Sequence, residues 1–196
     1  MHSLLRTNIE KTIKQEISDS EFEKFLQFAV AKEFDKKQFL IQEGQICEYI
    51  YFVEHGSCYS YMTDDIGEKH AVQFALEAYW ISDLYSFFSS QQAVYTIEAL
   101  EPVKVLALHK YNFQKACDSI PCFDRFFRIL VQNAYVSLQY RLARTNSDDA
   151  EKRYLEFSKK HTDFVQRIPQ YLIASYLGIK PQSLSRIRSK VHSKNQ

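Results

Sequence analysis

Apolar residues change their spacing twice along the chain. In residues 1–34 they recur at three- and four-residue steps, which predicts short helices, with Ser18 or Asp19 as a cap for the second one. From about residue 38 to 110 the chain is rich in Ile, Val, Phe and Tyr, and several stretches alternate apolar and polar positions. Glycine- and proline-marked breaks separate these stretches. The pattern predicts short strands of an all-β sandwich or jelly roll, after which residues 111–144 return to the helical spacing.

A long helix is expected to begin at Pro121, because proline suits the first turn of a helix. Its apolar positions step by three or four residues and form one stripe. The stripe consists of Phe123, Phe127, Leu130, Ala134, Leu138 and Leu142. It can belong to the core of its own chain, or it can pair with the same helix of a second copy in coiled-coil fashion. The polar segment at residues 145–149 is expected to be a hinge.

Residues 170–189 predict two helices joined by a tight turn. The first helix would bury Ile173 and Leu177, which lie four residues apart. Gly178 can adopt the left-handed backbone that ends a helix, and Pro181 suits the first turn of the next one. The turn would be closed by Ile179, and the second helix would bury Leu184, Ile187 and Val191.

The exposed face of this second helix is polar and carries almost no acid. Its residues are Gln182, Ser183, Ser185, Arg186 and Ser189. Arg can read guanine, and Gln can read adenine, through paired hydrogen bonds in the major groove of DNA. The cations placed to contact phosphates are Lys180, Arg188, Lys190 and Lys194. Residues 150–196 hold ten Lys and Arg against three Asp and Glu, whereas residues 1–149 hold 15 against 21. An ordinary helical hairpin with a solvated basic surface is the alternative.

Three glycine-marked segments occur in order in the β-rich region: Phe39–Gly44, Tyr51–Gly56 and Asp65–Lys69. Together with Ala99–Leu108, the long helix and the two-helix motif, they resemble the Crp/Fnr regulators from roughly residue 20 to the last residue. The resemblance implies an α+β fold. An N-terminal double-stranded β-helix or jelly roll of the cyclic-nucleotide-binding type would precede a dimerisation helix and a C-terminal helix-turn-helix. These parts would span residues 1–120, 121–144 and 150–196, without a full wing after the second helix.

The same resemblance implies a sequence-specific transcription regulator rather than an enzyme. Its expected partners are double-stranded DNA, a second copy of the chain, an unidentified small-molecule effector and RNA polymerase, and its expected location is the cytoplasm. The residues expected to bind DNA are Lys180, Gln182, Ser183, Ser185, Arg186, Arg188 and Lys190. The alternative is a sensor module that binds another small ligand and acts through protein contacts.

Crp/Fnr proteins that bind cyclic nucleotides hold the ribose with a Gly-Glu-Leu turn and the cyclic phosphate with an Arg-Ser/Thr-Ala segment. By resemblance these correspond to Ser82-Asp83-Leu84 and Ala93-Val94-Tyr95. Ala93 stands in place of the arginine and Val94 in place of the hydroxyl, so a buried phosphate would lack a paired cation. We expect no tight binding of cyclic AMP or cyclic GMP. The aromatic-rich pocket region is either collapsed or open to a less charged ligand.

The sequence shows no motif typical of metal binding, catalysis or membrane insertion. The four cysteines, Cys47, Cys58, Cys117 and Cys122, show none of the CxxC spacings of an iron–sulfur site, and the six histidines follow no metal-ligand pattern. A phosphate-binding glycine loop and a nucleophile elbow are also missing. No apolar run approaches the ~18 residues of a membrane span. We therefore expect no catalytic residue, metal, cofactor or membrane contact, and a reducing compartment.

Overall fold

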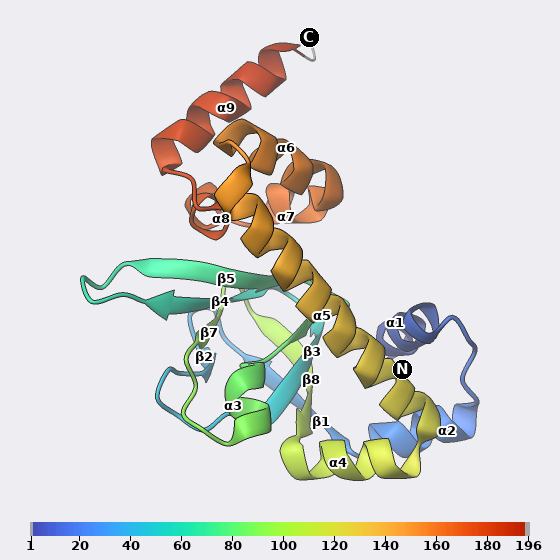
Figure 1. Cartoon of the computed structure of the whole chain (residues 1–196). Coiled ribbons are helices and arrows are strands. Elements are labelled where there is room, and N and C mark those ends of the chain that lie inside the picture. Colours follow the sequence, from blue (N-terminus) through green and yellow to red (C-terminus); the bar gives the residue numbers. More distant parts are fainter. Residues whose placement is uncertain (1, 195–196) are drawn as a thin grey trace. The chain divides into compact units, whose positions relative to one another are not determined.

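Figure 1 shows the computed structural model, which describes residues 2–194 except for the side chains of residues 145–147 and 192–194. The helices are α1 (Ser3–Ile13), α2 (Asp19–Leu26), α3 (Leu84–Ser89), α4 (Lys110–Ser119), α5 (Pro121–Ser147), α6 (Ala150–Lys160), α7 (Thr162–Arg167), α8 (Gln170–Leu177) and α9 (Pro181–Lys194). The strands are β1 (Ala29–Phe34), β2 (Phe39–Ile41), β3 (Tyr49–His55), β4 (Cys58–Thr63), β5 (Lys69–Ala75), β6 (Trp80–Ile81), β7 (Thr96–Ala99) and β8 (Val103–His109). The chain forms two compact units: Met1–Met62 with Gln73–Ala134, and Thr63–Val72 with Tyr135–Gln196.

Two short helices open the first unit, as the apolar spacing predicts. Residues 29–34, for which the same spacing also predicts helix, instead form strand β1, because they pair with β8. Leu5, Ile9 and Ile13 recur every four residues and lie buried along one face of α1. Ser18 begins α2 with a capping box: its hydroxyl accepts the N–H of Glu21, and the Glu21 carboxylate accepts the N–H of Ser18. Of the two caps that the sequence offers, the chain therefore uses Ser18.

The strands form two four-stranded sheets, in the orders β1-β8-β3-β6 and β2-β7-β4-β5. The pairings described within them are antiparallel; in the first sheet, for example, Ile50 lies opposite Leu108 and Ala31 opposite Leu106. The β-branched and aromatic residues of these strands suit the half-buried faces of a sandwich. The structure thus confirms the predicted antiparallel β domain followed by helices.

Gly56 forms the turn between β3 and β4 and has no room for a side chain. Its φ is 89°, in the left-handed region that L residues rarely adopt. A Cβ built there would lie 2.3 Å from the carbonyl oxygen of Pro102. The close approach of two backbone segments therefore explains why glycine stands at this turn.

The core of the first unit joins the sheets to the first turns of α5. The ring of Phe123 stacks on that of Phe25 in α2, with centroids 3.6 Å apart. The Trp80 ring lies 5.7 Å from Phe126 and 5.1 Å from Phe127, and its indole N–H donates to the Asn8 side chain of α1 at 3.1 Å. The buried polar tip of the tryptophan is thereby satisfied.

Helix α5 extends further than the sequence indicates. The break expected at residues 145–149 shortens to Asp148 and Asp149, because the helix continues to Ser147. The Arg144 guanidinium pairs with the Asp148 carboxylate at 2.9 Å, four residues on, and the Asp148 N–H donates to the Arg144 carbonyl at 3.0 Å. Asp149 then caps α6 by accepting the N–H of Lys152 at 2.8 Å.

Short helices form the remainder of the second unit and bury one apolar face each. The buried residues of α6, α7 and α8 are Tyr154, Phe157, Phe164, Leu172, Ile173, Ala174 and Leu177. Across the described part of the chain, none of the helices combines the length and the apolar character needed to cross a bilayer.

Candidate functional site

Helices α8 and α9 form the two-helix motif that the sequence predicts. Gly178 ends α8 with φ 62°, and its N–H donates to the carbonyls of Ala174 and Ser175. Ile179 follows as a buried residue, and its N–H donates to the Ala174 carbonyl at 2.9 Å. Pro181 begins α9. The local sequence thus determines both helix ends and the tightness of the turn.

Arg153 of α6 supports this turn, which the sequence pattern does not indicate. Its Nε donates to the Leu177 carbonyl at 3.0 Å and its Nη2 to the Gly178 carbonyl at 3.2 Å. A cation at the C-terminus of a helix satisfies carbonyls that lack partners within the helix and interacts favourably with the helix dipole. Arg153 therefore positions the start of α9 relative to α8.

The side chains of α9 divide into a buried row and an exposed face. Leu184 is buried, at 1% exposure, whereas Ile187 and Val191, expected in the same row, are half-buried. Gln182 and Arg186 lie one helical turn apart and are exposed, and among the described residues neither side chain has a hydrogen bond or ion pair within the chain. Of the other expected DNA-binding residues, Lys180, Ser185 and Lys190 are exposed, and Ser183 and Arg188 are half-buried.

The cations of α9 differ in how they are paired. Lys190 contacts the carboxylate of Glu151 on α6 at 2.7 Å, so part of its charge is offset locally. The Nε of Arg188 is buried and has no hydrogen-bond partner, while the residue lines a hollow beside Gln170 and Tyr171 at the start of α8. The side chain of Lys194, which the sequence also places toward phosphates, lies outside the described residues.

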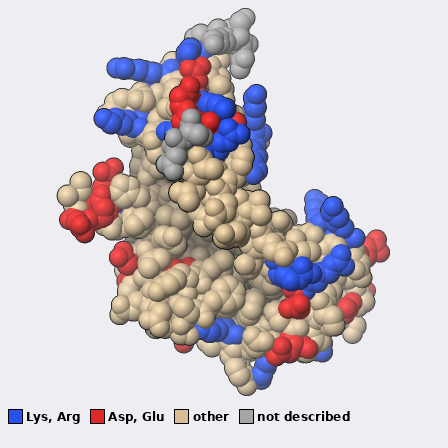
Figure 2. All heavy atoms as spheres, viewed as in Figure 1, with Lys and Arg blue, Asp and Glu red and all other residues tan. Residues whose placement is uncertain are grey.

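Figure 2 shows how charge is distributed on one face of the molecule. Lys and Arg side chains project around the C-terminal helices, with a small acidic group between them. This view agrees with the excess of Lys and Arg in residues 150–196. The surface that carries α9 is therefore suited to an anionic partner, and Glu151 lowers its positive charge locally.

The two segments that correspond by resemblance to the ribose and phosphate sites, residues 82–84 and 93–95, are here called the cassette; they lie at the start of α3 and before β7. Asp83 caps α3 and has no exposed surface. One oxygen of its carboxylate accepts the N–H of Ser86 at 2.9 Å, and the other accepts the N–H groups of Val94 at 2.8 Å and Tyr95 at 2.9 Å. A carboxylate of the chain itself thus occupies the backbone amides of the segment where a bound phosphate is expected. Three charge-assisted hydrogen bonds stabilise this closed arrangement.

The neighbouring cassette residues are also engaged within the chain. Ser82, at 8% exposure, donates its hydroxyl proton to the Tyr49 carbonyl at 2.9 Å. The hydroxyl of Ser86 accepts the N–H of Cys47 at 2.8 Å and donates to the Gln91 carbonyl at 2.6 Å. Ala93 is 3% exposed, Leu84 is half-buried and Val94 is exposed. A ligand could reach the Asp83 carboxylate only after these hydrogen bonds rearrange.

The aromatic residues around the cassette do not form one pocket. Phe87, Phe74 and Trp80 are buried, at 0%, 3% and 8% exposure, and Phe87 belongs to the core of the first unit. Tyr85 and Phe88 of α3 are instead about half exposed, at 54% and 51%. Most of the aromatic content that suggested a pocket is therefore core packing or exposed surface.

Metal-ligating groups gather at one place among the described residues. Ligand atoms of Asp64, Glu68 and His70, in the hairpin between β4 and β5, lie within 4.8 Å of one another. Hydrogen bonds of the turn account for this proximity, because the Asp64 carboxylate accepts the N–H groups of Ile66 and Glu68 and pairs with the His70 ring at 2.7 Å. The His70 ring, followed by the N–H of Glu68, lowers the pKa of Asp64.

The four cysteines are free thiols that do not converge on one site. Burial raises the pKa of Cys58 to about 12, and burial together with nearby carboxylates raises those of Cys117 and Cys122 to about 11. A thiol with so high a pKa holds almost no thiolate at neutral pH, and the thiolate is the form that binds metal and reacts.

Comparison with known proteins agrees with this architecture. The sequence profile of the cyclic nucleotide-binding domain matches residues 31–119. The c-di-GMP-responsive global regulator CLP of Xanthomonas campestris has a TM-score of 0.68 at 11% identity, over 91% of this chain and 93% of that one. FixK2 of Bradyrhizobium japonicum has a TM-score of 0.70 at 17% identity, over 85% and 86%. The chain carries a cyclic nucleotide-binding domain on the fold of a Crp/Fnr regulator.

The catabolite activator protein of Thermus thermophilus shares this Crp/Fnr fold, with a TM-score of 0.58 at 12% identity over 94% of this chain and 88% of that one. A search of curated protein sequences finds no match. The sequence analysis assigned the cassette positions by resemblance alone, and it did not predict the three amides bound by Asp83 or the support that Arg153 gives the turn. An Asp at a position that can cap a short helix was the signal available for the first. For the second there was none, because any of the Lys and Arg of residues 150–196 could have filled that role.

Proposed function

We propose that this chain is a sequence-specific DNA-binding transcription regulator of the Crp/Fnr type that acts as a homodimer. The observation that carries the proposal is the exposed face of α9, where the side chains of Gln182 and Arg186 have no partner among the described residues. A free amide and a free guanidinium on one helix face suit the base edges of a major groove. In a two-fold symmetric dimer the two α9 helices would enter major grooves about 34 Å apart.

Binding to a mixed-sequence duplex tests the electrostatic part of this proposal. At about 50 mM salt we expect micromolar binding, measured by fluorescence anisotropy with a labelled duplex. With Lys180, Arg188 and Lys190 of both copies on phosphates, a plot of log affinity against log salt should have a slope of about −5. Absence of binding at low salt would contradict the proposal and favour a module that acts through protein contacts.

The ion pair between Lys190 and Glu151 gives a prediction with a matched pair of variants. Glu151→Gln removes the carboxylate that offsets Lys190, so we expect tighter binding to all DNA sequences, by about threefold to tenfold at low salt. Lys190→Ala should weaken binding to all sequences and reduce the magnitude of the salt slope by about one phosphate contact per copy. Anisotropy titrations with specific and mixed duplexes check both. Equal DNA affinity in Glu151→Gln and the unaltered protein would show that this surface does not face DNA.

The second half of α5 supports the dimer. Its large apolar side chains are exposed in the single chain: Tyr135, Val136, Leu138, Tyr140 and Leu142 are each between 49% and 64% exposed. The buried Phe123 and Phe127 show that the predicted stripe belongs to the core at its start, whereas Leu138 and Leu142 are left for another partner. A second copy of α5 would cover them.

We expect Leu138→Glu to weaken dimer formation by about 100-fold or more, because the dimer would bury unpaired carboxylates. Asn133→Glu adds the same charge on the side of the helix that faces away from Leu138 and Leu142, and it should leave dimerisation nearly unchanged. Sedimentation equilibrium measures both dissociation constants. A monomeric unaltered protein at micromolar concentration, or a dimer insensitive to Leu138→Glu, would contradict the assignment of this interface.

We also propose that cyclic AMP is not the effector. The amides of Val94 and Tyr95 are already hydrogen-bonded to Asp83, and Ala93 supplies no cation. This closed arrangement therefore offers a phosphate neither free backbone N–H groups at Val94 and Tyr95 nor a cationic side chain at residue 93. Titration calorimetry with cyclic AMP is expected to show no binding at micromolar concentration, and micromolar binding would refute this part of the proposal.

A further inference from the structure

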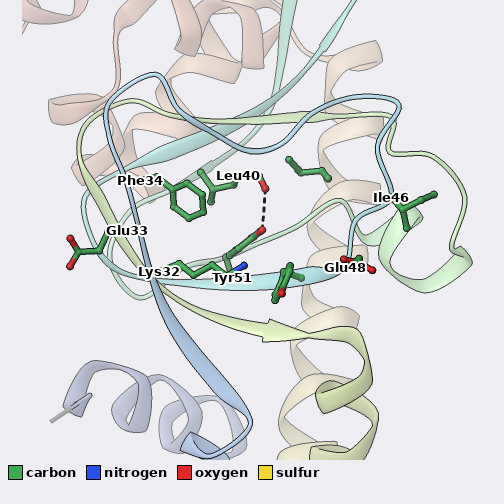
Figure 3. Close-up of a pocket in the computed structure, with 9 residues that line it drawn as sticks. Lys32, Glu33, Phe34, Leu40, Ile46, Glu48 and Tyr51 are labelled. Carbon is green, nitrogen blue, oxygen red and sulfur yellow. Dashed lines mark hydrogen bonds between the residues drawn. The ribbon is translucent and has the colours of Figure 1, made fainter.

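The first unit contains a hollow outside the cassette. It has a volume of about 450 Å³ and opens between β1 and β3 of one sheet and β2 and its following loop of the other. Its lining residues are Lys32, Glu33, Phe34, Leu40, Ile41, Ile46, Glu48, Tyr49 and Tyr51 (Figure 3). Sites for small ligands have volumes of roughly 300–1,000 Å³ and mainly apolar walls with a few polar groups. None of the cassette residues lines this hollow, so it is a different site.

The apolar part of the wall of this hollow is already held in place. Leu40 and Ile41 are 8% and 7% exposed, and the ring of Phe34 lies 6.1 Å from that of Tyr51. The hydroxyl of Tyr51 donates to the Leu40 carbonyl at 3.0 Å, a bond that joins the two sheets across the hollow (Figure 3). A ligand would therefore meet a preformed surface rather than order a loose one, which lowers the entropic cost of binding.

The charged side chains of the hollow are not equally available. Glu33 pairs with Lys104 at 2.9 Å and points away from the hollow in Figure 3, and Glu48 lies 4.0 Å from the His109 ring. Lys32 extends along the sheet towards Tyr51, and its ammonium lies 3.5 Å from the centre of the Tyr49 ring. Among the described residues no carboxylate comes within ion-pair distance of Lys32. Lys32 is therefore the cation that this hollow offers to an anionic ligand, whereas Glu48 is a carboxylate that would repel a second negative charge.

We infer that this hollow binds a small monocarboxylate with an apolar body. The carboxylate would pair with Lys32, and the body would lie against Phe34, Leu40 and Ile41. One lysine matches one negative charge, and burying apolar surface supplies the rest of the affinity. The carboxylate of Glu48 disfavours ligands with several negative charges, which separates this ligand class from nucleotides.

The loop between β2 and β3 connects the hollow to the cassette. Ile46 and Glu48 line the hollow, while the residues beside them bond to the cassette segments. Gly44 donates its N–H to the Ala93 carbonyl at 2.9 Å, Ala93 donates to the Gln45 carbonyl at 2.7 Å, and Cys47 bonds to Ser86. A ligand that moves this loop would also move the segments around Asp83. The hollow is thus placed to act as the effector site in a protein whose cassette is closed.

The test is calorimetric titration of the full chain, without DNA, with octanoate as the probe. Octanamide and octylamine have nearly the same apolar body as octanoate, but octanamide is neutral and octylamine is cationic. We expect octanoate to bind at least about tenfold more tightly than either, because only the carboxylate pairs with Lys32. Lys32→Met keeps most of the apolar stem and should remove this preference. Ile46→Trp should fill the hollow and weaken octanoate binding by about tenfold or more; Ile46 is 48% exposed, so the fold should tolerate this change.

Lys36→Met, at an exposed position that does not line the hollow, is the matched control and should change octanoate binding less than about twofold. The inference is overturned by no octanoate binding at millimolar concentration, by equal or tighter binding of octanamide or octylamine, or by Lys32→Met and Ile46→Trp variants that bind like the unaltered protein. Melting curves of all variants establish that they are folded. Because no DNA is present, failure here is distinct from failure of the proposed DNA binding.

Discussion

Replacing both Gln182 and Arg186 by alanine is expected to remove sequence discrimination while the protein still binds mixed-sequence DNA. Each side chain is exposed on α9 and free of partners among the described residues, so neither substitution breaks a contact of the folded chain. A bidentate contact to a base edge contributes about 1–3 kcal/mol of discrimination. Loss of both, about 2–6 kcal/mol, should therefore weaken specific binding by about 30-fold or more per half-site.

The phosphate contacts survive in this double variant, because Lys180, Arg188 and Lys190 are unchanged. The affinity for a mixed-sequence duplex should consequently decrease only slightly, because each copy loses the single positive charge of Arg186. The measurement needs a preferred duplex, obtained by selection from a random pool with the unaltered protein, followed by anisotropy titrations with both duplexes. The ratio of the two affinities is the decisive quantity.

A matched control removes an exposed amide and an exposed cation elsewhere in the same unit. Lys159→Ala with Gln166→Ala makes this change on α6 and α7. The ratio of specific to mixed affinity should stay within about twofold in this control. If the α9 double variant retained the discrimination of the unaltered protein, α9 would not be the helix that reads bases.

Asp83→Ala is expected to lower the free energy of unfolding of the first unit by about 3–5 kcal/mol. The substitution leaves the N–H groups of Ser86, Val94 and Tyr95 without their acceptor in a site with no exposed surface. A lost hydrogen bond to a charged group costs about 1.5–3 kcal/mol, and the losses are not fully additive. Asp83→Asn keeps the shape and one carbonyl acceptor, so its cost should be smaller.

Urea unfolding followed by tryptophan fluorescence measures this loss. Trp80 is the one tryptophan of the sequence and lies in the core of the first unit, so its emission reports on that unit. Asp35→Ala removes an exposed aspartate of the turn between β1 and β2 and should change the unfolding free energy by less than about 0.5 kcal/mol. If Asp83→Ala and the unaltered protein had the same unfolding midpoint, the Asp83 carboxylate would not be what holds the cassette closed.

Local features of the fold were readable from the sequence because each depends on nearby residues. The change from alternating to helical apolar spacing marks where the sheets end and α4 and α5 follow. Gly178 and Pro181 determine the turn between α8 and α9 through backbone conformation alone. The alanine at position 93, where the resemblance implies an arginine, is likewise read directly from a single residue of the sequence. Periodicity and backbone preference are short-range, and a single sequence records them directly.

Other features depend on residues far apart in the chain, and only the tertiary structure decided them. Asp83 meets the amides of Val94 and Tyr95 because α3 turns the chain back on itself, and Lys190 meets Glu151 only once α6 and α9 pack. The apolar stripe of α5 has one period throughout, yet Phe127 is buried and Leu138 is exposed. The spacing of apolar residues shows which side chains share one face of the helix, whereas their burial depends on what packs against that face. The sequence by itself therefore determined most of the helices and strands and the chemistry of the α9 face. Tertiary packing determined that residues 29–34 form a strand, which charges stay free and which pocket stays open.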